Sequence, residues 1–419
     1  MFEKKQIQSE NPKHSTRSSI VLILCCALFT GFIYYSSNSK PQTHFDYTLR
    51  VAENFSTGKI GLTEKPPSWL NEMIPFEGLW FSAFPLGSVL TLLPAALLKS
   101  AGIINENPAG FLAVFAAAAT AIFLLLIATH YKYSWIKRIL LVSAILFGTW
   151  MWTNLMMAGA WHLALGFAVL GEAGAIYFSI FNRRPLLAGF FFALAFGNRT
   201  EILLTAPIFM YLSVQSPKSK AQSPNEIQNP QSTIQNFASF CVVPFILGVS
   251  TLIYNYLRFH SFTDFGYARI PGVLNEPWYA HGIFSLSYIP LNAREMLLTQ
   301  WKSLPAFPYL APTGFGGAIW WSSPFLFFLF RPRARNKILW RAAWVAIFVL
   351  TFLLWTHGNP GGWQFSYRYA MTLLPWIFLI LLENSPEETT PVEWFVYLAS
   401  VAINAYATYL FFWTDYIKP

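Results

Sequence analysis

Asp46 occupies the position in this sequence that most strongly suggests chemistry. It follows the apolar run 20–37 by a few residues and stands near the start of the stretch 45–57. Four apolar residues recur in that stretch at helical spacing: Phe45, Leu49, Ala52 and Phe55. The spacing predicts an amphipathic helix on a membrane surface, with Asp46 at its start. A carboxylate there can accept a proton from an acceptor hydroxyl or amine, or it can simply cap the helix.

Two basic residues beside apolar segments, Lys65 and Arg199, are candidates for binding a phosphate, and a third, Arg368, stands beside a glycine-rich bend. Lys65 lies in the proline- and aromatic-rich stretch 63–87, whose aromatic residues could equally anchor the chain at the membrane interface. Arg199 stands near the middle of a long apolar run, where it can bind a lipid-linked phosphate or pair with Glu201. Arg368 follows a glycine-rich bend, which either lets the backbone approach a ligand or serves as a plain turn.

Other ionisable residues have both a functional and a structural interpretation. His162 lies near the start of an apolar run and can be a ligand or a satisfied structural residue. Glu172 lies in the middle of the same run, and an intramembrane carboxylate is a functional candidate unless it pairs with a neighbouring helix. Asp264 and Arg269 open a long loop, where solvated charges are the simpler interpretation.

Composition excludes several classes of protein. Of 419 residues, 55% are hydrophobic and 11% are charged, which is too little charge to cover a soluble globule of this size. The three cysteines, Cys25, Cys26 and Cys241, lie inside apolar runs, so we expect neither a disulfide framework nor a cysteine metal site. The net charge of +9 comes from short basic clusters between apolar runs. Such clusters indicate membrane topology signals rather than nucleic-acid binding.

A helix needs roughly 20 apolar residues to cross a bilayer. The clearest runs that predict spans are 20–37, 109–129, 139–156, 160–181, 236–256, 318–330, 339–356, 369–382 and 394–413.

Two further segments, 82–102 and 186–214, are ambiguous, and basic residues decide between their interpretations. Lys and Arg collect on the cytoplasmic side of short loops, and the short basic connectors are 130–138, 181–185 and 331–337. All three fall on the cytoplasmic side if 82–102 lies flat at the interface and 186–214 forms two short helices that turn at GNRTE. We therefore predict an interfacial helix at 82–102 and two short helices within 186–214.

The predicted fold is all-α, a polytopic integral membrane protein of about eleven transmembrane helices with interfacial helices in its outer loops. No A-x-A cleavage site follows the first run, which favours an uncleaved span over a signal peptide. We expect a cytoplasmic tail, 1–19, and a transmembrane catalytic domain, 20–385. The outer loops are 38–108 and 257–317, and 386–419 forms a C-terminal connector and last span. The polar segment 215–235 predicts a flexible cytoplasmic linker.

Six sequence elements resemble, in the same order, the GT-C superfamily of polytopic glycosyltransferases. The most similar branch contains the protein O-mannosyltransferases and the lipid A aminoarabinose transferase. The elements are HFDY (44–47), WFSAFPLGSVLTLLP (80–94), GNRTE (197–201), YNYLRFHSFTDFGY (254–267), GFGGAIWWSSPFL (314–326) and GGWQFSYRYAMTLLP (361–375). Each element alone is loose, but the order of six is fairly specific, and the resemblance extends from about residue 20 to 385.

The resemblance implies transfer of a sugar from a polyprenyl-phosphate donor on the extracytoplasmic face. An acidic residue just after the first span is the catalytic base of that family or lies beside it, and Asp46 occupies this position. Lys65 resembles the lysine that touches the donor phosphate in the aminoarabinose branch, and Arg368 falls where the family often has an arginine. We expect Asp46 to accept the acceptor's proton, while Arg199, Lys65 or Arg368 stabilises the departing phosphate. His162 and Arg269 are further candidates for substrate binding.

The sequence leaves the cofactor unknown. The aminoarabinose branch often has a second acidic residue where the third span passes to the fourth, but here that turn is followed by His162 and offers no acid. The sequence therefore leaves the need for a divalent metal undecided, because it offers no acidic pair that matches the one of that branch. We expect the donor, membrane lipids and a glycan, lipid or protein acceptor as partners, in a cell membrane such as the bacterial inner membrane.

Two other classes of function remain as alternatives. One is a transporter or flippase, against which stand the absence of an internal repeat and the two long outer loops. The other is a polymerase or ligase of surface polysaccharide, which would be expected to concentrate its chemistry in a late loop. Neither the sugar nor the acceptor follows from the sequence.

Overall fold

The computed structural model describes residues 12–38, 45–214 and 230–417. Most of the predicted tail, 1–19, and of the predicted linker, 215–235, therefore lies outside the described residues. The α-helices are α1 Pro12–Ser37, α2 Tyr47–Ser56, α3 Leu86–Ser100, α4 Ala109–Thr129, α5 Trp135–Leu146, α6 Met151–Met156, α7 Ala160–Ile176, α8 Pro185–Asn198, α9 Ala206–Val214, α10 Pro230–Phe259, α11 Ile289–Leu297, α12 Ile319–Ser322, α13 Lys337–Thr356, α14 Leu374–Asn384 and α15 Pro391–Phe412.

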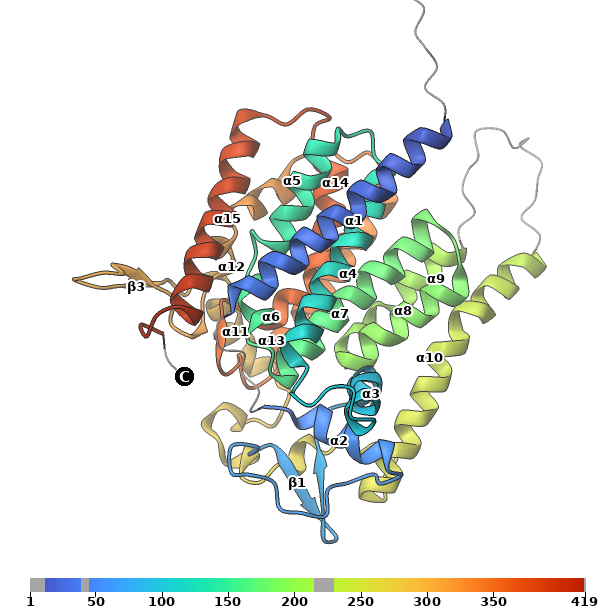
Figure 1. Cartoon of the computed structure of the whole chain (residues 1–419), viewed down its shortest axis with the longest axis vertical. Coiled ribbons are helices and arrows are strands. Elements are labelled where there is room, and N and C mark those ends of the chain that lie inside the picture. Colours follow the sequence, from blue (N-terminus) through green and yellow to red (C-terminus); the bar gives the residue numbers. More distant parts are fainter. Residues whose placement is uncertain (1–11, 39–44, 215–229, 418–419) are drawn as a thin grey trace, which may run out of the picture.

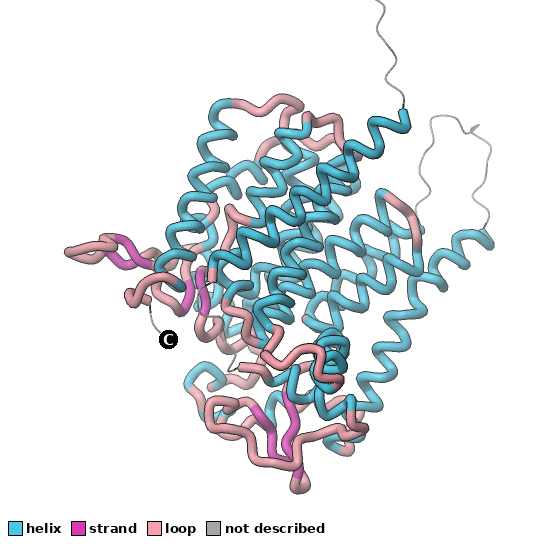
Figure 2. Tube along the Cα trace, viewed as in Figure 1, coloured by secondary structure: helices cyan, strands magenta, loops and turns pink. Residues whose placement is uncertain are grey.

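Strands are few and short. An antiparallel hairpin joins β1 Met73–Phe76 to β2 Leu79–Ser82, and a second joins β3 Lys302–Ser303 to β4 Leu310–Ala311. A parallel pair joins β5 Phe315–Gly316 to β6 Gln364–Phe365. Within the described residues the fold is therefore mostly helical, with strands confined to the loops (Figure 2).

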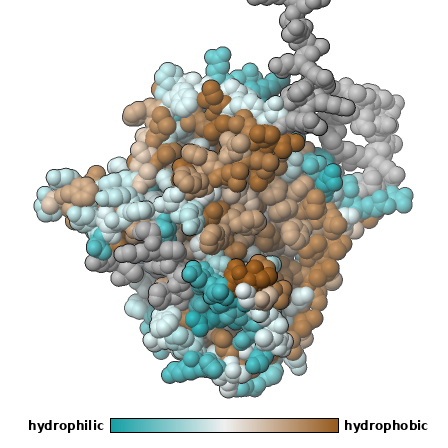
Figure 3. All heavy atoms as spheres, in the orientation of Figure 1, coloured by the Kyte–Doolittle hydropathy of each residue, from teal (hydrophilic) through white to brown (hydrophobic). Residues whose placement is uncertain are grey.

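Six helical segments of the described chain are long and apolar enough to cross a membrane: Ser18–Ser37, Ala109–Thr129, Ala160–Phe181, Thr233–Phe259, Lys337–Thr356 and Pro391–Phe412. On the face shown in Figure 3, hydrophobic side chains form a broad zone over the middle of the helices, with hydrophilic ones at the top and mostly hydrophilic ones over the lower, loop-rich part. These segments identify the chain as a multi-pass membrane protein.

Three of the predicted spans are not single helices. The run 139–156 is divided between α5 and α6, which are separated at residues 147–150. In 318–330, α12 ends before Pro324, which starts a 3-10 helix, and in 369–382 a 3-10 helix precedes Pro375 of α14. Proline favours the first turn of a helix and interrupts one that is already formed. Hydrophobicity alone does not reveal such breaks.

The predicted turn inside 186–214 is confirmed. Helix α8 ends at Asn198, Arg199 is extended, and a 3-10 helix, Thr200–Thr205, leads into α9. Helix α9 contacts the π-helical turn Tyr177–Phe181, which immediately precedes α8, so the chain doubles back. Helix α3 is seen nearly end-on in Figure 1, whereas α4, α7 and α8 run within the plane, so α3 lies across the direction of the bundle.

The two ends of the helix bundle differ in composition. One end, named here the basic end, gathers the connectors 130–138, 181–185 and 331–337. The ring of His130 lies 5.1 Å from that of Phe181, and Arg335 donates a hydrogen bond to the Tyr133 hydroxyl. The opposite end, named the loop end, carries α2, α3, the β1–β2 hairpin and the loops around residues 260–288 and 357–369 (Figure 1).

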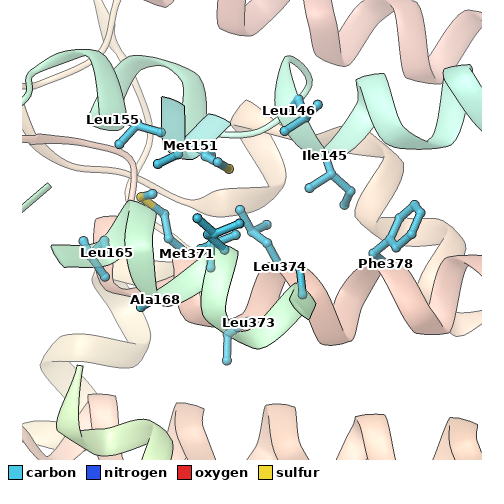
Figure 4. Close-up of a cluster of buried hydrophobic side chains, with 14 of the residues drawn as sticks. Ile145, Leu146, Met151, Leu155, Leu165, Ala168, Met371, Leu373, Leu374 and Phe378 are labelled. Atoms are coloured by element: carbon cyan, nitrogen blue, oxygen red, sulfur yellow. The ribbon is translucent and has the colours of Figure 1, made fainter. Parts of the chain in front are cut away.

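Short helical segments meet in the centre of the bundle. Figure 4 shows side chains of α5, α6, α7 and α14 pointing toward one another, together with those of the 3-10 helix Arg368–Leu373. Leu165 and Leu374 are fully buried there. The intramembrane carboxylate Glu172 accepts a hydrogen bond from Nε1 of Trp376 at 2.9 Å, so α7 pairs with α14 through it. This packing holds two loop-end segments in place, the one that directly follows α6 and the one that directly precedes α14.

Candidate functional site

Asp46 lies where the chain enters α2. A helix is confirmed at this place, since α2 begins at Tyr47. Its first half is buried around the whole helix, because Thr48, Leu49, Val51 and Ala52 are all buried. Asp46 is the N-cap residue by position, but its side chain makes no capping hydrogen bond. Instead its Oδ1 accepts a hydrogen bond from Nε of Arg50 at 2.7 Å. The carboxylate is thus held by an ion pair one turn along the helix rather than used as a cap.

An apolar pocket opens beside this carboxylate. Its lining consists of Phe45, Asp46, Thr48, Leu49, Leu92, Asn107, Ala109, Leu112, Ala158, Ala160 and Leu163. The backbone N–H of Ala160 donates to the carbonyl of Phe45 at 2.9 Å, so the start of α7 fixes the segment that carries Asp46. The cavity is small, about 10 Å³, which is room for roughly one water molecule beside the carboxylate.

Glu72 is a second carboxylate at the loop end, and the sequence reasoning passed over it. It immediately precedes β1, and its Oε2 accepts a hydrogen bond from Nε1 of Trp161 at 2.9 Å. Burial raises the pKa of Glu72 to about 7, although the Trp161 hydrogen bond and the charge of Arg368 act in the opposite direction. It is one of three carboxylates in the proline- and aromatic-rich stretch 63–87, with Glu64 and Glu77, and no sequence signal distinguishes it from them.

Trp161 joins the two acidic positions. Its ring lies 5.2 Å from the ring of Phe45 and 5.2 Å from that of Tyr47, the residues on either side of Asp46. The guanidinium of Arg368 lies 5.8 Å from the same indole. Glu72 and Arg368 therefore contact one tryptophan at the start of α7, and the two neighbours of Asp46 pack against the same ring.

Arg368 is a buried cation without a carboxylate partner among the described residues. Its side chain is 5% exposed, Nη1 donates to the Trp363 carbonyl at 3.1 Å, and Nη2 lies 3.4 Å from the Tyr369 hydroxyl. Its Nε has no hydrogen-bond partner in the described part of the chain. A buried guanidinium is costly unless negative charge offsets it, so this arrangement favours a bound anion.

His162 lies beside Arg368 and is also incompletely paired. It is 2% exposed, and neither of its ring nitrogens makes a hydrogen bond of good geometry within the described chain. The Trp363 carbonyl that accepts from Arg368 also lies near the imidazole. Two neighbouring basic side chains thus have unused hydrogen-bonding atoms at one place.

Arg199 reaches the same region from the turn between α8 and α9. Its Nε donates to Oε1 of Glu201 at 2.8 Å, so the structural alternative of an internal pair is present. Its guanidinium also lies over the ring of Tyr369 at 5.0 Å, and Tyr369 is the neighbour of Arg368. The turn therefore brings a paired arginine next to an unpaired one.

Two tyrosines and one histidine lie beside these basic residues at the loop end. The hydroxyls of Tyr267 and Tyr279 lie 2.7 Å apart, and the ring of each is 5.9 Å from that of His357. Burial raises the pKa of both tyrosines and lowers the pKa of His357. The Nδ1 of His357 lies 2.8 Å from the Asn359 carbonyl and therefore carries the proton. These groups are neutral near pH 7 and act as hydrogen-bonding and stacking surfaces.

Two predicted site residues are not joined to this cluster. Lys65 is exposed and forms no hydrogen bond or ion pair with the described residues. Arg269 pairs with Asp264 at 2.6 Å, and its guanidinium lies over the rings of Phe76 and Phe259. The structure thus brings together Asp46, His162, Arg199 and Arg368, adds Glu72, and leaves Lys65 and Arg269 apart.

The described residues contain no group of three or more His, Cys, Asp or Glu side chains that could hold a metal ion. The three cysteines are free. We name the residues Asp46, Glu72, His162, Arg199 and Arg368 the loop-end cluster. It combines two carboxylates with basic groups suited to an anion, and it borders an apolar pocket.

No protein-family model, no curated protein and no solved structure matches this chain.

Proposed function

We propose that the protein is a membrane glycosyltransferase that moves a sugar from a polyprenyl-phosphate donor to an acceptor on the extracytoplasmic face. The observation that supports this most is the buried pair of Arg368 and His162, whose hydrogen-bonding atoms are incompletely used. A phosphate would supply both the missing acceptors and the missing charge. Carboxylates lie next to this place, as proton transfer would require.

The proposed reaction is a substitution at the anomeric carbon of the donor sugar. An acceptor oxygen or nitrogen forms the new bond to that carbon, and the bond from the carbon to the phosphate oxygen breaks. Asp46 accepts the acceptor's proton, and the polyprenyl phosphate leaves with the bonding electrons. Arg368 and Arg199 stabilise the negative charge that develops on the phosphate. Lys65, His162 and Arg269 remain proposed contacts of the donor or acceptor.

The proposed topology has about eleven spans, with the shorter helices completing crossings that the six long segments do not make. The loop end then faces outward and the basic end faces the cytoplasm, with a cytoplasmic N-terminus. Single cysteines at Ser68 and Asn336, positions at the loop end and the basic end, test this with an impermeant reagent. Labelling of both from the same side would contradict the topology.

The decisive experiment offers the purified protein, in lipid nanodiscs, a panel of polyprenyl-phosphate sugars and candidate acceptors. We expect release of polyprenyl phosphate with one sugar, and glycan, lipid and protein acceptors would be compared for its transfer. Parallel reactions with a chelator show whether a divalent metal is needed. Movement of the donor between leaflets without release of polyprenyl phosphate would favour a flippase, and growth of a sugar polymer would favour a polymerase.

A further inference from the structure

The β3–β4 hairpin, residues 302–311, projects sideways from the helix bundle (Figure 1). Its outward side chains are large and apolar, since Phe307 is 48%, Tyr309 62% and Leu310 54% exposed. A soluble loop seldom presents such residues together. The hairpin therefore carries a surface that requires a partner.

The position of the hairpin along the bundle is fixed by Tyr406 of α15. The hydroxyl of Tyr406 donates to the carbonyl of Pro308 at 2.7 Å and also lies 3.2 Å from that of Leu310. The ring of Trp301, the residue before β3, stacks on the Tyr406 ring at 6.3 Å. Both sides of the hairpin are thus attached to one turn of a candidate membrane span.

That attachment defines how far the hairpin lies from the loop end of α15. Tyr406 precedes Phe412, the last residue of α15, by six residues, so its backbone lies about 9 Å inside the end of the helix. Glu393, near the other end of α15, pairs with Lys137 and Arg331 of the basic end. The hairpin therefore leaves the bundle near the boundary of the membrane on the loop-end side.

Neighbouring side chains continue the apolar surface at the same depth. Tyr409, Trp413 and Tyr416 are exposed, and the ring of Tyr416 lies 5.6 Å from that of Phe307. Exposed Tyr and Trp favour the zone between hydrocarbon and water, because one part of each ring is apolar and another can hydrogen-bond. These residues form one band with the hairpin.

The backbone of the hairpin indicates that the hairpin does not lie in the hydrocarbon core of the bilayer. Outside the two-residue ladder, the N–H groups of Leu304, Tyr309 and Leu310 make turn hydrogen bonds. The N–H groups of Ala306 and Phe307 have no backbone partner in the described chain, and such groups are not tolerated in hydrocarbon. Lys302 is the one charged residue in the sequence between Glu295 and Arg331, so an acidic or strongly charged protein partner has little to recognise. Headgroup-level lipid satisfies the polar backbone, the lysine and the aromatic rings together.

We propose that the β3–β4 hairpin lies in the headgroup region of the bilayer at the loop end and binds phospholipid there. The inference is independent of the proposed enzymatic activity. It also has a local consequence, because the chain continues from the hairpin into β5, and β5 pairs with β6 four residues before Arg368. Lipid contact would steady the strand pair that precedes the 3-10 helix Arg368–Leu373.

The test measures immersion depth with nitroxide labels on single cysteines. The background replaces Cys25, Cys26 and Cys241 by Ala, and Phe307→Cys carries the label in vesicles of phosphatidylcholine and phosphatidylglycerol. Tyr309→Cys provides a second position in case the first variant does not assemble. Ser68→Cys at an exposed loop-end position and Phe348→Cys on the exposed face of α13 supply water and hydrocarbon references.

We expect the ratio of oxygen accessibility to nickel-complex accessibility at the hairpin to fall between the two references. A ratio equal to that of Ser68→Cys would place the hairpin in water and overturn the proposal. Dipolar broadening between labels on different molecules, at high lipid-to-protein ratio, would instead identify a second copy as the partner and would also overturn it.

Discussion

The basic end and the loop end both bury charged side chains. The fully buried Lys137 and Glu393 of the basic end are paired, although the half-buried Arg138 of the same end leaves its Nε without a partner in the described chain. Lys137 and Glu393 are 1% and 0% exposed and lie 3.3 Å apart, and the other oxygen of Glu393 accepts from Arg331 at 2.6 Å. The Glu388 carbonyl and the Thr390 N–H make the remaining hydrogen bonds. At the loop end, Arg368 has no carboxylate partner in the described chain.

This difference separates structural charge from charge available to a ligand. A satisfied buried network links segments of the fold, and removing one member leaves the others uncompensated. An unsatisfied buried cation is tolerated when function requires it and a ligand completes it. Substitutions at the basic end should therefore reduce stability, whereas those at the loop end should reduce activity.

The largest effect is expected from Asp46→Asn, which keeps size and hydrogen bonding but removes the proposed base. Transfer from the lipid donor should fall by about 10²–10⁴-fold while membrane insertion persists. Arg50→Gln is the matched control, because it removes the same ion pair and leaves the carboxylate. Near-normal transfer by Asp46→Asn would move the search for the base to Asp264 or Glu72.

Lys137→Met tests the basic end. It should lower the free energy of unfolding by about 3 kcal/mol, because the buried Glu393 loses the buried one of its two cationic partners. The donor KM of the remaining folded protein should not change. Thermal unfolding in nanodiscs measures the first quantity, and the exposed Lys132→Met in the same connector is the control. Equal stability of the two variants would contradict a structural network.

Arg368→Gln tests the unpaired cation. Removing one side of a buried ionic contact with the donor phosphate should raise the donor KM by about 10²-fold. Stability should stay the same or increase, since no carboxylate loses its partner. The control is the exposed loop-end residue Arg294, changed to Gln. A strongly destabilised Arg368→Gln protein would show that this arginine is structural after all.

A pH dependence of stability should follow from Glu72. Its pKa in the folded state, about 7, lies above the ordinary value of 4.5, so the folded protein favours the protonated carboxyl. The protonated Glu72 therefore contributes to the free energy of unfolding fully below pH 4.5, and this contribution is lost as the pH rises through 7. It amounts to about 2 kcal/mol after allowance for partial solvent access. Glu72→Gln should flatten the curve of melting temperature against pH. Glu77→Gln, an exposed carboxylate in the same hairpin, should not.

Arg199→Ala should give the smallest effect, about a tenfold weaker use of the donor, because this arginine already pairs with Glu201. The protein should still accumulate in the membrane. Loss of the protein itself, seen by immunoblotting of membrane fractions, would mean that the Arg199–Glu201 pair holds the turn between α8 and α9.

The sequence predicted the features that depend on period and charge. Two such features are the helix that begins directly after Asp46, which followed from apolar spacing, and the break at Arg199, which followed from the placement of basic connectors. The sequence did not predict the split of 139–156 or the 3-10 segments before Pro375 and after Ser323. An apolar run has the same composition whether its helix is continuous or broken. Glu72 was missed because its importance depends on Trp161, 89 residues away in the sequence.

The lysine buried at the basic end also constrains how the protein is made. Lys137 and its carboxylate partner Glu393 are separated by 256 residues. At about 5–20 residues per second, the ribosome needs roughly 10–50 s to supply that partner after the lysine has emerged. During this interval the nascent chain holds an unneutralised charge in a segment destined for burial. A chain truncated before Glu393 would lack this carboxylate partner of Lys137 altogether.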